Sequence, residues 1–255
     1  MIFVLILFLC FALFFSLLLV NYPDVFQKAG YSTGKKLPIQ LPNIAYAFFI
    51  LLFSLITGFL LKTNFKKTSS AEIFFFTIFI LSLSLESFRV GQVLLQLQNK
   101  SAYFGILLTR IVYFGKIFGV LCLFSSGLFA AGIKYQKFGI IIGFDLLLSL
   151  SLASTIPVDF SILHSNFLYK IGNGRELVFA FIVIEIFSVL NYCWAAFTKN
   201  DPEYSLIALG LFFVILGREL LFFMPGPVLV CTGFIFLIGG TILFSNRTHY
   251  VYLWS

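Results

Sequence analysis

The chain has 255 residues, of which 60% are hydrophobic and 11% are charged, whereas a soluble domain has roughly 45–50% apolar and about 25% charged residues. This composition excludes an ordinary soluble globule and makes the lipid bilayer the main solvent of the chain. The net charge of +7 does not indicate nucleic-acid binding, because the Lys and Arg residues lie in short segments between apolar runs, where they set membrane orientation.

Long apolar runs follow one another along the whole chain. A membrane-spanning helix needs about 20 mostly apolar residues, and the sequence therefore predicts an all-α integral membrane protein, a polytopic bundle of about eight transmembrane helices, with seven as the alternative count. The predicted spans, in chain order, are 2–20, 43–61, 73–98, 104–132, 138–156, 177–197, 204–224 and 228–244. None of the connecting segments is long enough for a soluble domain, so we expect residues 1–255 to form a single transmembrane domain.

The first run resembles the apolar core of a signal peptide, but two features oppose that interpretation. No Lys or Arg precedes it, and it is followed by Asn21-Tyr22-Pro23-Asp24, which lacks a small-residue cleavage pattern. We therefore expect residues 2–20 to be a retained helix.

The helix starts in the two halves of the chain are offset by 124 to 136 residues, which suggests an internal repeat of residues 1–133 and 134–255. Pro23 and Pro157 both close the first helix of their half, and Glu86 corresponds to Glu219. Such matches also arise by chance in a chain with 36 Phe residues. A tandem 4+4 parallel repeat is found in several transporter folds, with the site at the repeat interface; the alternative is that stacked helical hairpins simply resemble one another.

Lys and Arg are densest in the short loops on the side of the N-terminus. By the positive-inside rule, this pattern predicts an integral plasma (inner) membrane protein with both termini in the cytoplasm. Tyr250, Tyr252 and Trp254, which follow the last predicted span, are interpreted as an interfacial anchor.

Ionisable residues inside spans are the most informative feature of the sequence. An isolated charge at the bilayer centre costs about 2.5–3.5 kcal/mol, so such residues face the bundle interior and pair. The spans contain four acids and four bases, which balance: Glu86, Arg89, Arg110, Lys116, Asp145, Glu185, Arg218 and Glu219. The remaining acids are assigned to loops: Asp24, Glu72, Asp159, Glu176, Asp201 and Glu203.

The span 73–98 carries a polar stripe, because residues at helical spacing fall within about one third of its circumference: Ser82, Glu86, Arg89, Gln92 and Gln96. Glu86 and Arg89 are expected to pair with each other. The candidate intramembrane polar site consists of Glu86, Arg89, Gln92, Asp145, Glu185, Arg218 and Glu219. The alternative is a static ion-pair network that fixes helix register. Arg110 and Lys116 are instead interpreted as anchors whose long side chains snorkel to the interface.

Three glycine motifs are read as structural. Gly115-xxx-Gly119 and Gly139-xxx-Gly143 have the spacing that lets helix backbones approach closely, and we expect packing inside the bundle rather than dimerisation. The segment 172–175, Gly-Asn-Gly-Arg, is interpreted as a plain turn, with an anion site as the alternative.

No catalytic or metal-binding motif is found, and the four Cys and two His residues lack ligand spacing, so we expect no cofactor, no metal site and no enzyme. The sequence leaves two functions open. One is a permease for a small solute or ion that uses the polar stripe; the other is a non-enzymatic membrane sensor, adaptor or subunit of a larger complex. The expected partners are the lipid bilayer, a small solute or ion, and a membrane protein, but no nucleic acid.

Overall fold

A computed structural model of the chain describes residues 41–65, 70–97, 102–133, 138–164, 166–223 and 226–254. Within these residues the elements are α3 (Leu41–Asn64), α4 (Ala71–Leu83), the 3₁₀ helix η2 (Ser84–Phe88), α5 (Arg89–Leu97), α6 (Ala102–Ala130), α7 (Phe138–Thr155), β1 (Val158–Leu163), β2 (Tyr169–Ile171), α8 (Gly174–Lys199), α9 (Glu203–Phe223) and α10 (Pro227–Trp254).

Seven helical segments in the described part of the chain are long and apolar enough to cross a membrane: Tyr46–Asn64, Ala71–Gln92, Tyr103–Ala130, Phe138–Thr155, Gly174–Lys199, Glu203–Phe223 and Val228–Tyr252. They confirm the all-α polytopic membrane fold and the seven predicted spans that begin with 43–61. The predicted span 2–20 lies outside the described residues. The internal repeat of 1–133 and 134–255 therefore stays a prediction, since its first helix is not described.

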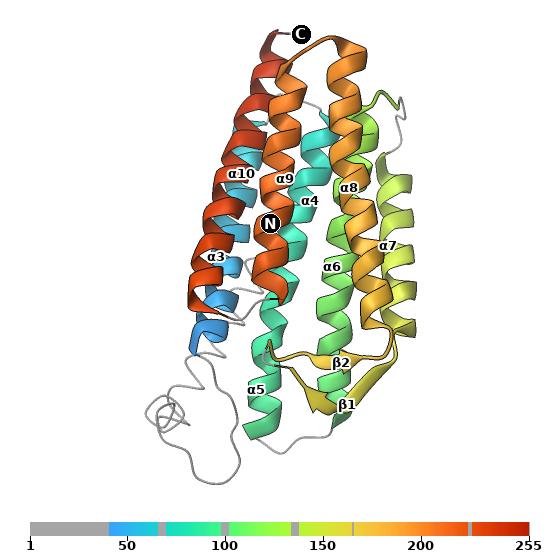
Figure 1. The fold of residues 1–255 in the computed structure, drawn as a ribbon, viewed down its shortest axis with the longest axis vertical. Helices are drawn as coiled ribbons and strands as arrows, with labels where there is room; N and C mark the ends of the chain where they lie inside the picture. The colour runs from blue at the N-terminus through green and yellow to red at the C-terminus, as the bar shows by residue number, and fades with distance from the viewer. Residues whose placement is uncertain are drawn as a thin grey trace.

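The helices run along one common axis, with α4 in the interior of the bundle (Figure 1). In the span that begins with α4, 67% of the most apolar stretch is buried by the rest of the protein, whereas in α7 this share is 17%. α3 and α10 lie on one side of α4, whereas α6, α8 and α7 lie on the other (Figure 1). A charged residue on the α4 side of any neighbouring helix is therefore shielded from lipid.

Glycines bring α9 and α10 into the closest contact in the bundle. Gly217 on α9 faces α10 so closely that a Cβ there would lie 2.5 Å from the Leu237 nitrogen and 2.7 Å from the Gly233 carbonyl oxygen. Two turns earlier on α9, a Cβ at Gly210 would lie 2.8 Å from the Phe244 nitrogen and 3.1 Å from the Gly240 carbonyl oxygen. Only glycine lets the two backbones approach so closely. These glycines are seven residues apart on each helix, Gly210 and Gly217 on α9 and Gly233 and Gly240 on α10, and neither spacing was among the predicted motifs.

The two predicted glycine motifs differ in outcome. A Cβ at Gly115 on α6 would lie 2.8 Å from the Leu85 Cβ, so this motif packs α6 against η2, as predicted. Around Gly139 and Gly143 on α7 no described atom lies within 4 Å of an added Cβ. Against the described helices, the predicted packing is therefore absent for α7, because that helix turns these glycines away from its described neighbours.

The predicted loop 157–176 contains an antiparallel hairpin, β1 paired with β2, which covers one end of the bundle (Figure 1). Val158 lies opposite Ile171 and Asp159 opposite Lys170. Asn166 and Phe167 form the turn: the Asn166 side chain accepts from the Leu168 amide at 3.2 Å, and Phe167 has a positive φ of 61°. We call this end of the molecule the hairpin end.

The last helix is longer than predicted. α10 continues through Trp254, ten residues beyond the predicted end at 244, so Tyr250 and Tyr252 belong to a helix rather than to a tail. Contacts with α9 hold this extension: Arg247 lies 3.2 Å from Glu203, and Thr248 is buried.

Candidate functional site

The helix that carries the predicted polar stripe changes its winding at Glu86. α4 tightens into the five-residue 3₁₀ helix η2 before it resumes as α5. The hydroxyls of Ser82, Ser84 and Ser87 each donate to the carbonyl three residues earlier, at 2.7 Å. Such bonds compete with the i to i−4 ladder, and a 3₁₀ stretch within a long helix often marks a functional hinge. The sequence SLSLES therefore places an irregular turn beside the buried Glu86.

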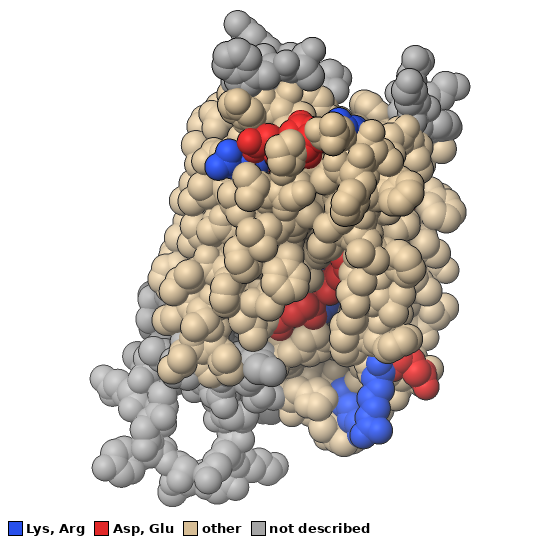
Figure 2. All heavy atoms as spheres, turned by 45° about the horizontal axis from the view of Figure 1, so that its top comes forward, with Lys and Arg blue, Asp and Glu red and all other residues tan. Residues whose placement is uncertain are grey.

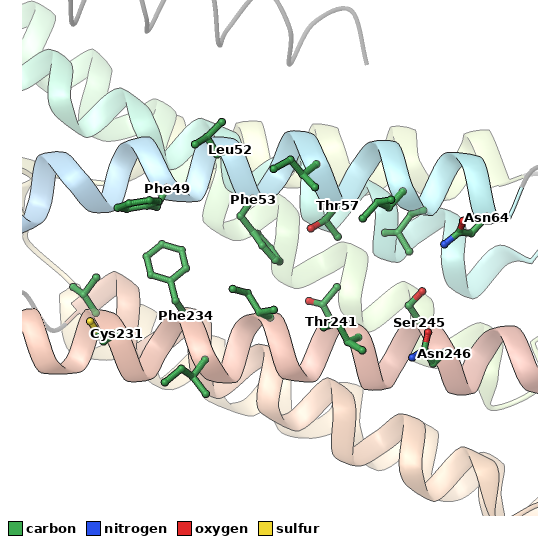
Figure 3. A pocket seen from close by; sticks show the side chains of 17 residues that line it. Phe49, Leu52, Phe53, Thr57, Asn64, Cys231, Phe234, Thr241, Ser245 and Asn246 are labelled. Atoms are coloured by element: carbon green, nitrogen blue, oxygen red, sulfur yellow. The ribbon is translucent and has the colours of Figure 1, made fainter.

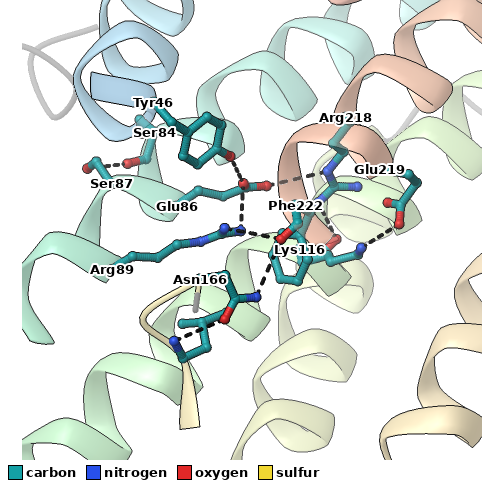
Figure 4. Close-up of polar contacts among 11 residues, drawn as sticks. Tyr46, Ser84, Glu86, Ser87, Arg89, Lys116, Asn166, Arg218, Glu219 and Phe222 are labelled. Atoms are coloured by element: carbon teal, nitrogen blue, oxygen red, sulfur yellow. Dashed lines mark hydrogen bonds and ion pairs between the residues drawn. The ribbon is translucent and has the colours of Figure 1, made fainter. Parts of the chain in front are cut away.

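Glu86 contacts side chains from three different elements (Figure 4). Its Oε2 accepts from the Tyr46 hydroxyl on α3 and, at 3.1 Å, from Arg89 Nη2. Its Oε1 lies 3.5 Å from Nε of Arg218 on α9. The carboxylate is 1% exposed. The predicted pairing of Glu86 with Arg89 is thus present, and Arg218 is a second cation on the same acid.

Arg218 connects η2 to α6 and α8. Its Nη2 donates to the Lys116 carbonyl at 2.9 Å, and its Nη1 lies 4.0 Å from Oε1 of Glu185 on α8. A Cβ at Gly119 would lie 3.3 Å from the same Nη2, so glycine leaves the room for the guanidinium. Arg218 is among the largest fully buried side chains.

Lys116 is the third cation of the site. It is fully buried, and its Nζ donates to Oε2 of Glu219 at 2.7 Å. The Phe222 and Phe223 rings each lie with their centroids 4.0 Å from this Nζ. The prediction that Lys116 is an interfacial anchor is wrong. Fourteen residues into α6, it lies about 21 Å from the helix start, too far for its side chain to reach the interface.

These contacts define the charge cluster: the acids Glu86, Glu185 and Glu219 with the bases Arg89, Lys116 and Arg218. Three acids and three bases balance, which reduces the large cost of placing each ion in a low-dielectric interior. The Phe222 carbonyl accepts from Arg89 Nη1 at 3.3 Å, and the Phe222 ring centroid is 4.1 Å from the guanidinium carbon. The cluster joins η2 and α5 to α6, α8 and α9.

Two predicted site residues lie elsewhere. Gln92 is buried, but its amide donates to the Gly105 carbonyl and to Thr109 at 3.1 Å, both on α6. Asp145 on α7 accepts from Ser125 on α6 at 2.9 Å. Gln92 thus links α5 to α6, and Asp145 links α7 to α6. The structure therefore brings together five of the seven predicted site residues and separates Gln92 and Asp145 from them.

Sequence reasoning missed Tyr46 and Phe222. A buried Tyr hydroxyl needs a hydrogen-bond partner, so the position of Tyr46 within the predicted span 43–61 could have indicated a polar partner inside the bundle. Phe222 gave none, because nothing in the sequence distinguishes it from the other 35 Phe residues. Arg110, predicted to be an anchor, is half-buried, and its Nη2 lies 3.5 Å from the Ile156 carbonyl near the hairpin end.

A second polar group lies toward the end of the bundle opposite the hairpin. Glu72, assigned to a loop from the sequence, is 2% exposed in the first turn of α4 and lies 3.9 Å from Lys199. The Lys199 Nζ contacts the Tyr204 hydroxyl at 2.6 Å. Glu72 was misassigned because the apolar run begins one residue after it.

Charged side chains on the face seen in Figure 2 gather toward the two ends of the molecule, except for acidic side chains in a hollow on its apolar side. Of the cluster acids, Glu219 is the most accessible, with its side chain 23% exposed, whereas Glu86 and Glu185 are 1% and 5% exposed. The charge cluster is therefore not completely sealed from its surroundings.

A cavity of about 900 Å³ opens at the hairpin end, between β2 and the start of α8. We call it the hairpin cavity. Its lining includes Tyr113 and Phe223, the second of which also contacts Lys116. One layer of aromatic side chains thus separates this cavity from the charge cluster.

A groove of about 1000 Å³ lies between α3 and α10 (Figure 3). Its walls are mostly apolar, with Phe49, Phe53 and Phe234 at one part and Asn64, Ser245 and Asn246 at the other. None of the cluster residues lines it, so it has no direct connection with the charged site.

Comparison with known proteins identifies no family: no family model matches the chain, and no curated protein is significantly similar to it. Within the described residues, no three His, Cys, Asp or Glu side chains converge as metal ligands.

Proposed function

We propose that this polytopic membrane protein is a permease for a small solute or ion, and that the charge cluster is its intramembrane site. The observation that carries the proposal is the position of the cluster. It lies at an irregular turn of a spanning helix, where four membrane-spanning segments meet, one aromatic layer below an open cavity. Interrupted helices beside polar residues are the usual construction of transporter sites.

The ion pairs of the cluster suit a transport site in which charged side chains exchange one partner for another. Each acid of the cluster faces a base on another helix, so a small movement of α9 exchanges one ion pair for another rather than exposing a bare charge. Arg218 contacts both Glu86 and Glu185 and is the residue best placed for such an exchange. With both termini in the cytoplasm, the hairpin cavity opens to the outside of the membrane.

Flux measurements test this proposal. The purified protein is reconstituted into liposomes, and movement of H⁺, Na⁺, K⁺ and radiolabelled benzoate down imposed gradients is compared with that in empty liposomes. We expect the wild type to accelerate at least one of these fluxes and Glu86→Gln and Glu219→Gln to remove most of the acceleration. Glu203→Gln, whose pair with Arg247 lies outside the cluster, is the matched control. If the wild type moves none of the four probes, the proposal fails.

A second function is favoured by a different aspect of the same cluster. Its three acids and three bases neutralise one another, and neither described cavity is lined by any of them. A charge-balanced network of this kind also suits a non-enzymatic sensor, adaptor or subunit that transmits its state through helix contacts. A stable membrane-protein partner in a mild-detergent pull-down, with no flux in liposomes, would select this function instead.

A further inference from the structure

We propose that the hairpin cavity binds a small carboxylate with an apolar body, and that this class of anion is the solute carried. The second half of this statement rests on the proposed permease function, whereas the binding site stands without it. The volume of about 900 Å³ lies within the roughly 300–1,000 Å³ of small-molecule sites.

Two cations supply the charge complementarity. Lys170 on β2 and Arg175 on α8 both line the cavity, and neither forms an ion pair with a described carboxylate. Glu176 is the one acid in the described lining. A carboxylate that reaches both cations gains charge-assisted hydrogen bonds, and Arg offers the planar fork that carboxylates fit.

Asp159 is the strand partner of Lys170, but its carboxylate is engaged elsewhere. Its Oδ1 accepts from the Ser161 hydroxyl at 2.6 Å and from the Ser161 amide at 2.9 Å; these bonds, with a smaller contribution from the charge of Lys170, hold the pKa of Asp159 below its usual value, but no described ion pair joins the two side chains. Asp159 does not line the cavity. Lys170 therefore keeps its donors for another acceptor.

A hydroxyl without a described protein partner supports a polar ligand at the inner wall. Tyr113 lines the cavity and is 7% exposed, and its hydroxyl forms no hydrogen bond to any described group. Its ring packs edge-on against Phe222, 5.7 Å between centroids, which fixes its position. Because Tyr113 borders the cavity, its hydroxyl is free to exchange a hydrogen bond with a polar atom of a bound ligand.

His164, Asn166 and Asn173 also line the cavity, and the rest of its wall is mostly apolar and leads toward the charge cluster. Val178, Phe179, Ile182 and Phe223 supply the surface against which the body of the anion packs. Beyond the Phe223 ring lies Lys116, whose Nζ is 4.0 Å from the ring centroid. The next cation after Lys170 and Arg175 is thus one side chain deeper, which suits a carboxylate that moves inward.

The test uses three probes of one shape and different charge: benzoate, benzamide and benzylammonium. Each is titrated against the purified full-length protein in an uncharged detergent, and ligand-observed NMR measures binding. We expect benzoate to bind about tenfold or more tightly than benzamide, a difference of about 1.4 kcal/mol, and benzylammonium to bind least. Equal binding of benzoate and benzamide would overturn the proposal.

Variants locate the site. Lys170→Gln and Arg175→Gln are expected to weaken benzoate binding by about tenfold each, and Tyr113→Phe by a smaller factor, since charged hydrogen bonds are the stronger ones. Lys62→Gln, an exposed Lys in the last turn of α3, is the control and should leave binding unchanged. Benzoate binding that survives the double variant Lys170→Gln/Arg175→Gln would also overturn the assignment.

An anionic lipid headgroup offers the same chemistry as a soluble carboxylate, and a separate measurement distinguishes them. If phosphatidylglycerol nanodiscs stabilise the protein through Lys170 and Arg175 while benzoate does not bind, the cavity is a lipid site and the solute proposal is wrong. Counterflow of benzoate in liposomes separates the two claims. Binding without counterflow refutes the permease and keeps the site, whereas counterflow that is insensitive to the double variant refutes the site and keeps the permease.

Discussion

Arg218 reaches across the bundle to Glu86, with its Nε 3.5 Å from the carboxylate oxygen, although the two residues are separated by about half of the chain. Both side chains are 1% exposed. The pair joins α9 to the 3₁₀ turn η2, so the winding change in one helix and the position of the other depend on the same contact. This relationship makes the cluster a tertiary feature rather than a property of one helix.

Loss of the Glu86 charge should destabilise the protein severely. Glu86→Gln leaves Arg89 and Arg218 buried with less compensation, and removing one partner of a buried pair costs about 3–5 kcal/mol. Reversible unfolding in mixed micelles measures the change. Glu203→Gln is the comparison, because its pair with Arg247 is partly exposed and such pairs contribute about 0–1 kcal/mol. Similar losses for both variants would contradict the assignment.

Lys116 and Glu219 should be energetically coupled. Lys116→Met and Glu219→Gln each leave an unpaired charge, whereas the double variant removes the pair and restores neutrality. We expect the double variant to be more stable than the sum of the single losses predicts, by about 1–3 kcal/mol. The four proteins of the cycle are compared by unfolding in micelles, and strict additivity would show that the 2.7 Å contact carries no coupling.

Phe222 should stabilise the folded protein through its cation–π contacts with Arg89 and Lys116 as well as through its buried volume. Its ring centroid lies 4.1 Å from the Arg89 guanidinium carbon and 4.0 Å from Lys116 Nζ. Phe222→Leu is therefore expected to cost about 1–2 kcal/mol more than Phe76→Leu, because cation–π contacts contribute about 0.5–2 kcal/mol each. Phe76 is equally buried but stacks on Phe244, with 4.1 Å between centroids. Equal unfolding free energies for the two variants would refute this role.

The glycines of α9 and α7 should respond in opposite directions to the same substitution. At Gly217 an added methyl group meets the Leu237 nitrogen at 2.5 Å, and we expect Gly217→Ala to destabilise by about 1–3 kcal/mol. At Gly143 there is open space, and Ala is the better helix former by up to about 1 kcal/mol. Thermal unfolding of both variants in one detergent decides the comparison; a stabilised Gly217→Ala would show that the two helices separate easily.

Much of the fold was predictable, because membrane-spanning helices are recognised from length and hydropathy alone. The sequence also predicted that the span with Glu86 and Arg89 turns a polar face inward, since a charge facing lipid is too costly. The hairpin of β1 and β2 was not predicted: its strands alternate apolar and polar residues, but at six and three residues they are too short for that alternation to be distinctive. The identity of residues 2–20 as a span remains a prediction.

Composition by itself determined the solvent of this protein, the approximate number of its helices and the small set of charges that had to be hidden. Only the tertiary structure decided which of those charges meet. It joined Glu86, Arg89, Glu185, Arg218 and Glu219 with Lys116, and it placed Gln92 and Asp145 elsewhere. The physical reason is that helical periodicity specifies which residues share a face of one helix, whereas the packing of four separate membrane-spanning segments specifies which faces meet.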